Sequence, residues 1–227
     1  MRIGIVVNPI AGMGGRVGLK GTDGKVAEAR DRGAMPRAPD RASRMLDRLA
    51  DLAPETDLLT AGDPMGESLA RAAGFEPTVV YEPGVDSGAV EPTMTVESNT
   101  TAKDTAAAVA AFIQADVDLV LFFGGAGTAA DVAEALSETG IPMLGVPAGV
   151  KVYSSVFAVS PEDAADSVVS FDRTERREVM DINEDAYREG EVNPELRAIG
   201  WVPVTDELQS SKQLCGGTVE ALAAGVV

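Results

Sequence analysis

The chain has 227 residues, 45% of them apolar, and carries 36 acidic against 19 basic side chains for a net charge of −17. It contains no histidine, which excludes a Ser-His-Asp triad, a histidine general base and a histidine metal ligand. The strong negative charge argues against a nucleic-acid partner, and no apolar run is long enough to cross a membrane. We therefore expect neither nucleic acid nor membrane among its partners.

The composition also indicates the environment in which the protein works. Abundant Asp and Glu with scarce Lys are typical of cytoplasmic proteins in molar salt, where the Debye length falls to about 3 Å and charge repulsion is screened. The single cysteine, Cys215, cannot form an internal disulfide, which favours a reducing cytoplasm and argues against a structural zinc site. We expect a halophilic, cytoplasmic protein; an acidic protein from an ordinary cell is the alternative.

Apolar, β-branched runs alternate with alanine-rich amphipathic segments from residue 2 to residue 169. Strands are predicted at 2–8, 56–61, 76–83, 118–123 and 142–146. Helices are predicted at 40–52, 66–74, 100–116, 128–138 and 160–169. Thr100 or Thr101, followed by Asp104, resembles a capping box at the start of the third helix. The alternation predicts an α/β fold with a doubly wound, mostly parallel sheet.

The pattern changes near residue 172, where polar and apolar residues alternate at period two. Turn signals at Asn183 and at Asn193-Pro194 divide this segment, which predicts β-hairpins. We therefore expect an α/β nucleotide-binding domain over residues 1–171 and the start of a β-rich domain over residues 172–227. The second segment is short for a β domain, and a new helix begins near its end, so we expect this domain to be truncated.

Two glycine-rich segments follow predicted strands. Residues 8–24 contain six glycines together with Arg16 and Lys20. The second segment lies between a strand and a helix and comprises Gly124, Gly125, Gly127 and Thr128. Ligands bind at the carboxyl ends of strands in doubly wound folds, and the N–H groups of such turns attract anions, so phosphate binding is favoured. A tight turn that needs positive φ, and a surface loop with incidental bases, are the alternatives.

Two further segments carry polar side chains that are candidates for binding an acceptor. The first, residues 145–161, follows a strand, and its polar side chains include Lys151, Tyr153 and Ser154. The second is a predicted turn with the side chains Asp181, Asn183 and Glu184. The apolar residues of the first also fit the start of a core helix, and spacing leaves that choice open. For the second, spacing favours a simple Asx-turn over a site that holds ribose hydroxyls.

Three of these segments together resemble a known family. They read FFGGAGTAADV, GVPAGVKVYSSVFAVSP and VNPIAGMGGRVGLKGTDG, and they resemble the ATP-NAD kinase family, most closely its archaeal and bacterial branch of predicted polyphosphate- or ATP-dependent NAD kinases. That family belongs with the diacylglycerol and sphingosine kinases. The resemblance covers residues 2–161, and EVMDINEDAYREG extends it to about residue 190.

The resemblance implies transfer of a phosphoryl group from ATP or polyphosphate to the 2′-hydroxyl of the adenosine ribose of NAD, which gives NADP. It implies an α/β nucleotide-binding domain followed by a β-rich domain, with the active site between them. Mg²⁺ is expected to bridge the donor phosphates, and no set of side chains is expected to hold a metal by itself. NAD kinases commonly assemble as dimers or tetramers, so a homo-oligomer is expected.

The motif match also assigns residues to parts of the site. The phosphate and NAD site is expected to comprise Gly124, Gly125, Gly127 and Thr128. The donor phosphates are expected to contact the first glycine-rich segment, at Asn8, Gly12, Gly14, Gly15 and Lys20. The acceptor nucleotide is expected to contact Asn183 and Glu184, which resemble the Asn-Glu pair of NAD kinases.

The sequence departs from the family motif at Ala126, where the family has an aspartate between the two glycine pairs. That aspartate is taken to orient and deprotonate the attacking hydroxyl or to help hold the metal, and a methyl group does neither. General base catalysis is worth about 10²–10⁴-fold, so we expect an impaired NAD kinase. A nucleotide-binding regulatory pseudo-enzyme without turnover is the alternative. A lipid or small-alcohol kinase of the same superfamily is a second, which the acidic, aromatic-poor second region disfavours.

Overall fold

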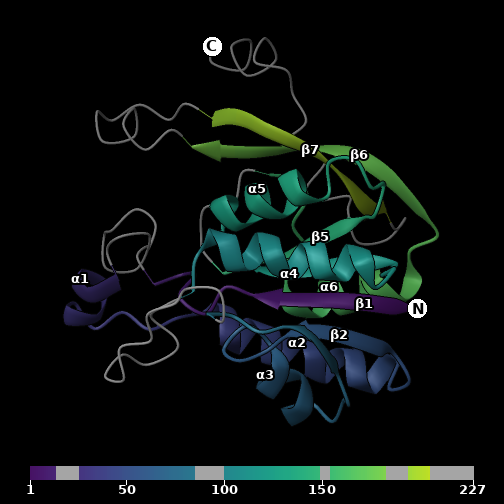
Figure 1. Cartoon of the computed structure of the whole chain (residues 1–227), viewed down its shortest axis with the longest axis horizontal. Coiled ribbons are helices and arrows are strands. Elements are labelled where there is room, and N and C mark those ends of the chain that lie inside the picture. The colour runs from purple at the N-terminus through teal and green to yellow at the C-terminus, as the bar shows by residue number, and fades with distance from the viewer. Residues whose placement is uncertain (14–25, 85–99, 149–153, 183–193, 205–227) are drawn as a thin grey trace, which may run out of the picture.

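The computed structural model describes residues 1–13, 26–84, 100–148, 154–182 and 194–204, which form an α/β structure (Figure 1). The strands of its main sheet are β1 (Arg2–Val7), β2 (Asp57–Ala61), β3 (Thr78–Tyr81), β4 (Leu119–Gly124) and β5 (Met143–Pro147). Its helices are α1 (Val26–Asp31), α2 (Ala38–Leu52), α3 (Glu67–Ala72), α4 (Ala102–Gln114), α5 (Ala126–Ala135) and α6 (Pro161–Ser170). All five strands pair in parallel, in the order β3-β2-β1-β4-β5, which confirms the expected fold class.

Helices cover both faces of this sheet (Figure 1). Helix α2 contacts α3 and α6 on one face, and α4 contacts α5 on the other. Strand β4 is buried at every position because it is an interior strand and is covered on both faces. Close packing reaches the backbone at Gly4, where an added Cβ would lie 2.6 Å from the ring of Phe112 on α4.

The chain order of the strands defines the edge at which a ligand is expected. From the central β1 the chain proceeds outward through β2 and β3, then returns to the other side of β1 for β4 and β5. The carboxyl ends of β1 and β4 therefore flank the point where the winding reverses. In doubly wound sheets, ligands bind in the crevice at such a switch point.

A second, antiparallel pair follows the main sheet, formed by β6 (Arg173–Ile182) and β7 (Pro194–Val204). It contacts α5 and β5, and its buried side chains Val179 and Val202 belong to the same apolar core as the main sheet. The predicted domain boundary at residue 171 stays a prediction. Among the described residues, β6 and β7 share the core of the preceding unit.

Several element boundaries differ from the predicted ones. Helix α2 begins at Ala38 because Pro39 fits within its first turn, where its missing N–H costs nothing. Helix α5 begins at Ala126 because Gly125, in an extended conformation, forms its N-cap. The short helix α1 was not predicted. No helix in the described part of the chain is long and apolar enough to cross a bilayer.

The amino end of α4 confirms the predicted capping box, with Thr101 at the N-cap. The Asp104 carboxylate accepts hydrogen bonds from Thr101 N at 2.7 Å, Thr101 Oγ1 at 2.9 Å and Tyr81 Oη at 2.8 Å. It also accepts one from Gly84 N at 3.3 Å, so this largely buried acid ties the end of β3 to α4. Burial raises the pKa of Asp104, but the accepted hydrogen bonds outweigh burial and lower it below its ordinary value.

We expect Asp104→Asn to lower the free energy of unfolding by about 1–3 kcal/mol at neutral pH, because hydrogen bonds to a charged acceptor are lost. A carboxylate with a depressed folded-state pKa stabilises the fold above its unfolded value, about 3.9, and this stabilisation is lost as pH falls through the folded value. Urea unfolding from pH 7 to pH 3 measures both effects. The difference between parent and variant should shrink below about pH 4, and a difference independent of pH would contradict this role.

Candidate phosphate-binding site

The loop after β1 is bonded directly to the start of α5. Asn8 Nδ2 donates a hydrogen bond to Thr128 Oγ1 at 3.1 Å, across 120 residues of sequence. The backbone N–H of Asn8 donates to Phe123 O at 2.9 Å, which continues the pairing of β1 with β4 by one residue. Asn8 Oδ1 accepts from Ile10 N at 3.2 Å and so shapes the turn that follows. Two of the three sequence motifs therefore meet at the switch point.

The third motif reaches the same edge through Ala148, which directly follows β5. Ala148 N donates to Gly124 O at 2.9 Å. Gly12 has φ +85°, and an added Cβ there would lie 2.4 Å from Ala148 O. Gly12 is thus required both by its left-handed backbone and by this close approach. The residues that directly follow β1, β4 and β5 therefore lie together at one edge of the sheet.

The glycines of the second motif fall into two kinds. A Cβ on Gly124 would lie 2.5 Å from Thr128 Cβ, so internal packing requires glycine there. Gly125 has an extended backbone with φ −106°, and a Cβ on Gly125 or on Gly127 would meet no atom of the described residues within 4 Å. Neither packing nor positive φ demands glycine at these two positions. Their bare backbone fits a site where a ligand approaches closely.

The amino end of α5 supplies hydrogen-bond donors at the same place. The first bond of this helix runs from Ala129 N to Gly125 O, so the N–H groups of residues 126–128 precede the helical ladder. Of the side chains that the structure describes, none caps the helix, and no acid lies in its first turn. The positive end of the helix dipole and these N–H groups therefore favour an anion such as phosphate.

Ala126 occupies the first position of α5 and is half-buried between Gly125 and Gly127. Its methyl group offers no atom that accepts a proton or coordinates a metal. Among the described residues, no group of three or more acidic or cysteine side chains is arranged to hold a metal ion. The described residues therefore do not fit a protein-held magnesium. Mg²⁺ carried on the donor phosphates stays a prediction.

The acceptor-binding candidates are placed only in part. Ser154 is buried; its Oγ donates to Met180 O and accepts from Met180 N, both at 2.8 Å. These bonds hold β6 against the segment after β5 and disfavour a ligand-binding role for Ser154, which stays a prediction. Asp181 was predicted in a turn but lies in β6 opposite Glu195, because the strand continues to Ile182. The remaining predicted site residues, Gly14, Gly15, Lys20, Lys151, Tyr153, Asn183 and Glu184, lie outside the described part of the chain.

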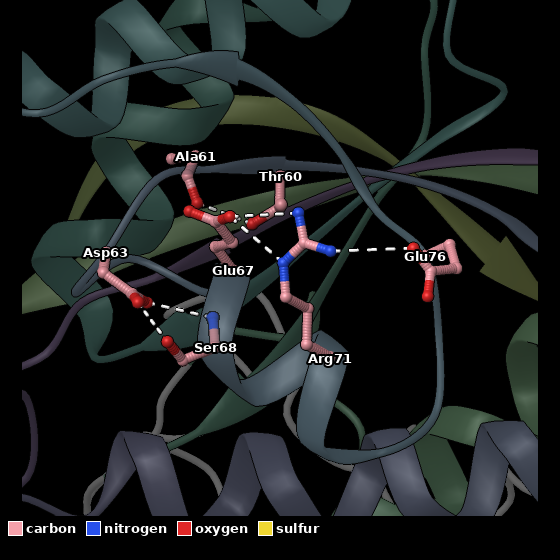
Figure 2. A network of polar contacts seen from close by, with 7 residues as sticks. All are labelled: Thr60, Ala61, Asp63, Glu67, Ser68, Arg71 and Glu76. Atoms are coloured by element: carbon pink, nitrogen blue, oxygen red, sulfur yellow. Dashed lines mark hydrogen bonds and ion pairs between the residues drawn. The ribbon is translucent and has the colours of Figure 1, made fainter.

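The carboxyl end of β2 carries a separate polar network, shown in Figure 2. Asp63 accepts hydrogen bonds from the backbone N–H and the hydroxyl of Ser68, which fixes the start of α3. Arg71 pairs with Glu67 at 3.1 Å and with Glu76 at 3.7 Å. These charged groups pair with one another and hold α3 in place.

The sequence analysis did not predict a small pocket, which the structure shows. It lies beside the Asn8 loop and brings together side chains from three segments. Its lining comprises Asn8, Pro9, Ile10, Met65, Thr100, Thr101, Ala102 and Thr105. The only sequence signal for these threonines was the helix cap, which does not indicate proximity to Asn8.

Residues 3–171 match the sequence profile of the ATP-NAD kinase N-terminal domain. The chain belongs to the ATP-NAD kinase family. Among solved structures, the molybdenum cofactor binding protein from the phototrophic bacterium Rippkaea orientalis is 18% identical, with a TM-score of 0.41 over 74% of this chain and 94% of that chain. So distant a likeness has no bearing on function. A search of curated proteins finds no match.

Two glycine substitutions in this ATP-NAD kinase domain should separate packing from binding. Gly124→Ala is expected to lower the free energy of unfolding by about 1–3 kcal/mol, because its Cβ overlaps Thr128. Gly125→Ala should leave stability nearly unchanged but weaken NAD binding, because its Cβ enters the open cradle. Urea unfolding and calorimetric titration with NAD measure the two effects. Undiminished NAD binding by a folded Gly125→Ala variant would contradict the cradle.

Ser154→Ala tests whether that hydroxyl is structural. Both hydrogen bonds to the backbone of Met180 would be lost, so we expect unfolding to become easier by about 1–3 kcal/mol. NAD affinity, measured where the variant is fully folded, should be unchanged. Unchanged stability with weakened NAD binding would instead support the acceptor role.

Proposed function

We propose that the chain provides the nucleotide-binding part of an NAD kinase, which transfers a phosphoryl group from ATP or polyphosphate to the 2′-hydroxyl of the adenosine ribose of NAD. In this proposal NAD and the donor are its small-molecule partners, and Ala126 impairs turnover. The family supports a phosphotransferase; the reaction of this chain is our inference.

The convergence of three loops at the switch point is the observation that carries this proposal. Asn8 reaches Thr128, and Ala148 reaches Gly124, so the donor and NAD motifs share one edge. The bare backbone of Gly125 and Gly127 and the uncapped end of α5 then supply donors for phosphate oxygens. Phosphoryl transfer depends chiefly on such positioning and charge stabilisation.

At position 126 the chain has a methyl group where the family motif has a carboxylate. The backbone N–H groups that bind phosphate do not depend on the side chain at position 126. The proton of the attacking hydroxyl, however, has no carboxylate acceptor at this position. In this proposal the chain still binds nucleotide through its backbone, and water accepts the proton of the attacking hydroxyl.

We expect Ala126→Asp to raise the rate of NADP formation by about 10²-fold or more, because a general base is restored. NADP formation from NAD is measured with Mg-ATP and, in parallel, with polyphosphate, in molar KCl. The control is Ala126→Asn, which has nearly the same shape but no basic carboxylate. Equal rates for the Asp and Asn variants would contradict a general base at this position.

The intact cradle beside a missing acid also favours a second candidate, a regulatory module that binds nucleotide without turnover. This candidate predicts measurable NAD affinity and no NADP from the parent chain or from Ala126→Asp. Turnover by the aspartate variant would exclude it.

A further inference from the structure

A row of four arginines lines one side of α2. Their spacing of three and four residues places them on one face of the helix. They are Arg37, Arg41, Arg44 and Arg48. The two farther from the amino end of the helix are neutralised by α6, since Arg44 pairs with Glu162 at 2.8 Å and Arg48 pairs with Asp166 at 2.9 Å.

Helix α6 begins beside Arg44, so it does not extend far enough to form the same ion pairs with Arg37 and Arg41. Glu162, the partner of Arg44, is already the second residue of α6, so no turn of α6 lies beside the preceding turn of α2. In the described part of the chain, Arg41 Nε is buried and has no hydrogen-bond partner. Burial lowers the pKa of Arg41, and repulsion from Arg37 and Arg44 lowers it further, against attraction by Asp40 and Glu162.

The amino end of α2 contacts the loop after β1, which carries Asn8. Arg37 N donates to Ala11 O at 3.0 Å, and a Cβ on Gly12 would lie 3.0 Å from Arg37 Cβ. Arg41 follows one helical turn later, and side chains on a helix lean toward its amino end. A buried N–H group without an acceptor, such as the Nε–H of Arg41 among the described residues, is costly, and arginine forms strong charge-assisted hydrogen bonds with phosphate oxygens.

We propose that Arg37 and Arg41 form a subsite for the distal phosphates of the phosphoryl donor, next to the loop that carries Asn8 and Gly12. The ligand is a chain of linked phosphates, as in inorganic polyphosphate or the tail of a nucleoside triphosphate. This inference rests on the proposed function, because it assigns the donor to that site. It adds two residues that no sequence motif indicated.

Calorimetric titration of the full chain with inorganic tripolyphosphate tests the subsite without requiring turnover. We expect Arg41→Gln to weaken tripolyphosphate binding about tenfold or more, because a charge-assisted contact is lost. The matched control is Arg44→Gln, which removes the same charge one turn away and should change affinity less than about twofold. Without ligand, Arg41→Gln should melt no lower than the parent chain, because no described residue accepts a hydrogen bond from the buried Arg41 Nε.

A parallel titration with ATP distinguishes a nucleoside triphosphate from inorganic polyphosphate as the ligand of the subsite. Equal losses for ATP and tripolyphosphate support a subsite for their shared phosphate chain, and a larger loss for tripolyphosphate supports inorganic polyphosphate as the donor. A loss for ATP alone, equal effects of the Arg41 and Arg44 variants, or no tripolyphosphate binding by the parent chain would overturn the subsite. If Arg41→Gln binds tripolyphosphate normally while Ala126→Asp makes NADP, the subsite fails and the proposed function stands.

Discussion

The parallel register of β1 on β4 is the constraint on which the candidate site depends. Val7 pairs with Phe123, so the next residues, Asn8 and Gly124, emerge side by side from the sheet. The Asn8–Thr128 hydrogen bond is possible because of this register. A shift by one residue would turn the Asn8 side chain to the other face of the sheet and separate the two motifs. The apolar burial of β1 and β4 therefore fixes the polar edge as well as the core.

Local signals in the sequence predicted much of this fold, because they are enforced by local chemistry. The Thr101 cap and Pro161 at the start of α6 each satisfy needs of a few adjacent residues. The joining of Asn8 to Thr128 and of Ser154 to Met180 spans long stretches of chain, and no periodicity encodes it. No sequence signal singles out Arg41, because its environment depends on where α6 begins.

The glycines of the second motif have two different roles, packing and open space, which the sequence motif alone does not distinguish. Of the motif glycines, Gly124 serves packing against Thr128, whereas Gly125 and Gly127 leave space unfilled. The phosphate cradle consists of backbone donors and a helix end, which tolerate change in neighbouring side chains. Chemistry at Ala126 depends on one side chain alone. In the proposed function, the scaffold of the family therefore loses turnover and keeps its ligand.

The shared core of β6, β7 and the main sheet has a consequence for dividing the protein. The family match ends at residue 171, yet Val179 and Val202 complete the apolar covering of the preceding unit, and the Met180 backbone satisfies Ser154. A fragment cut at residue 171 would expose that apolar surface and leave a buried hydroxyl without its partners. The end of the family match and the end of the shared apolar core therefore do not coincide, and a fragment expressed to residue 171 should be prone to aggregation.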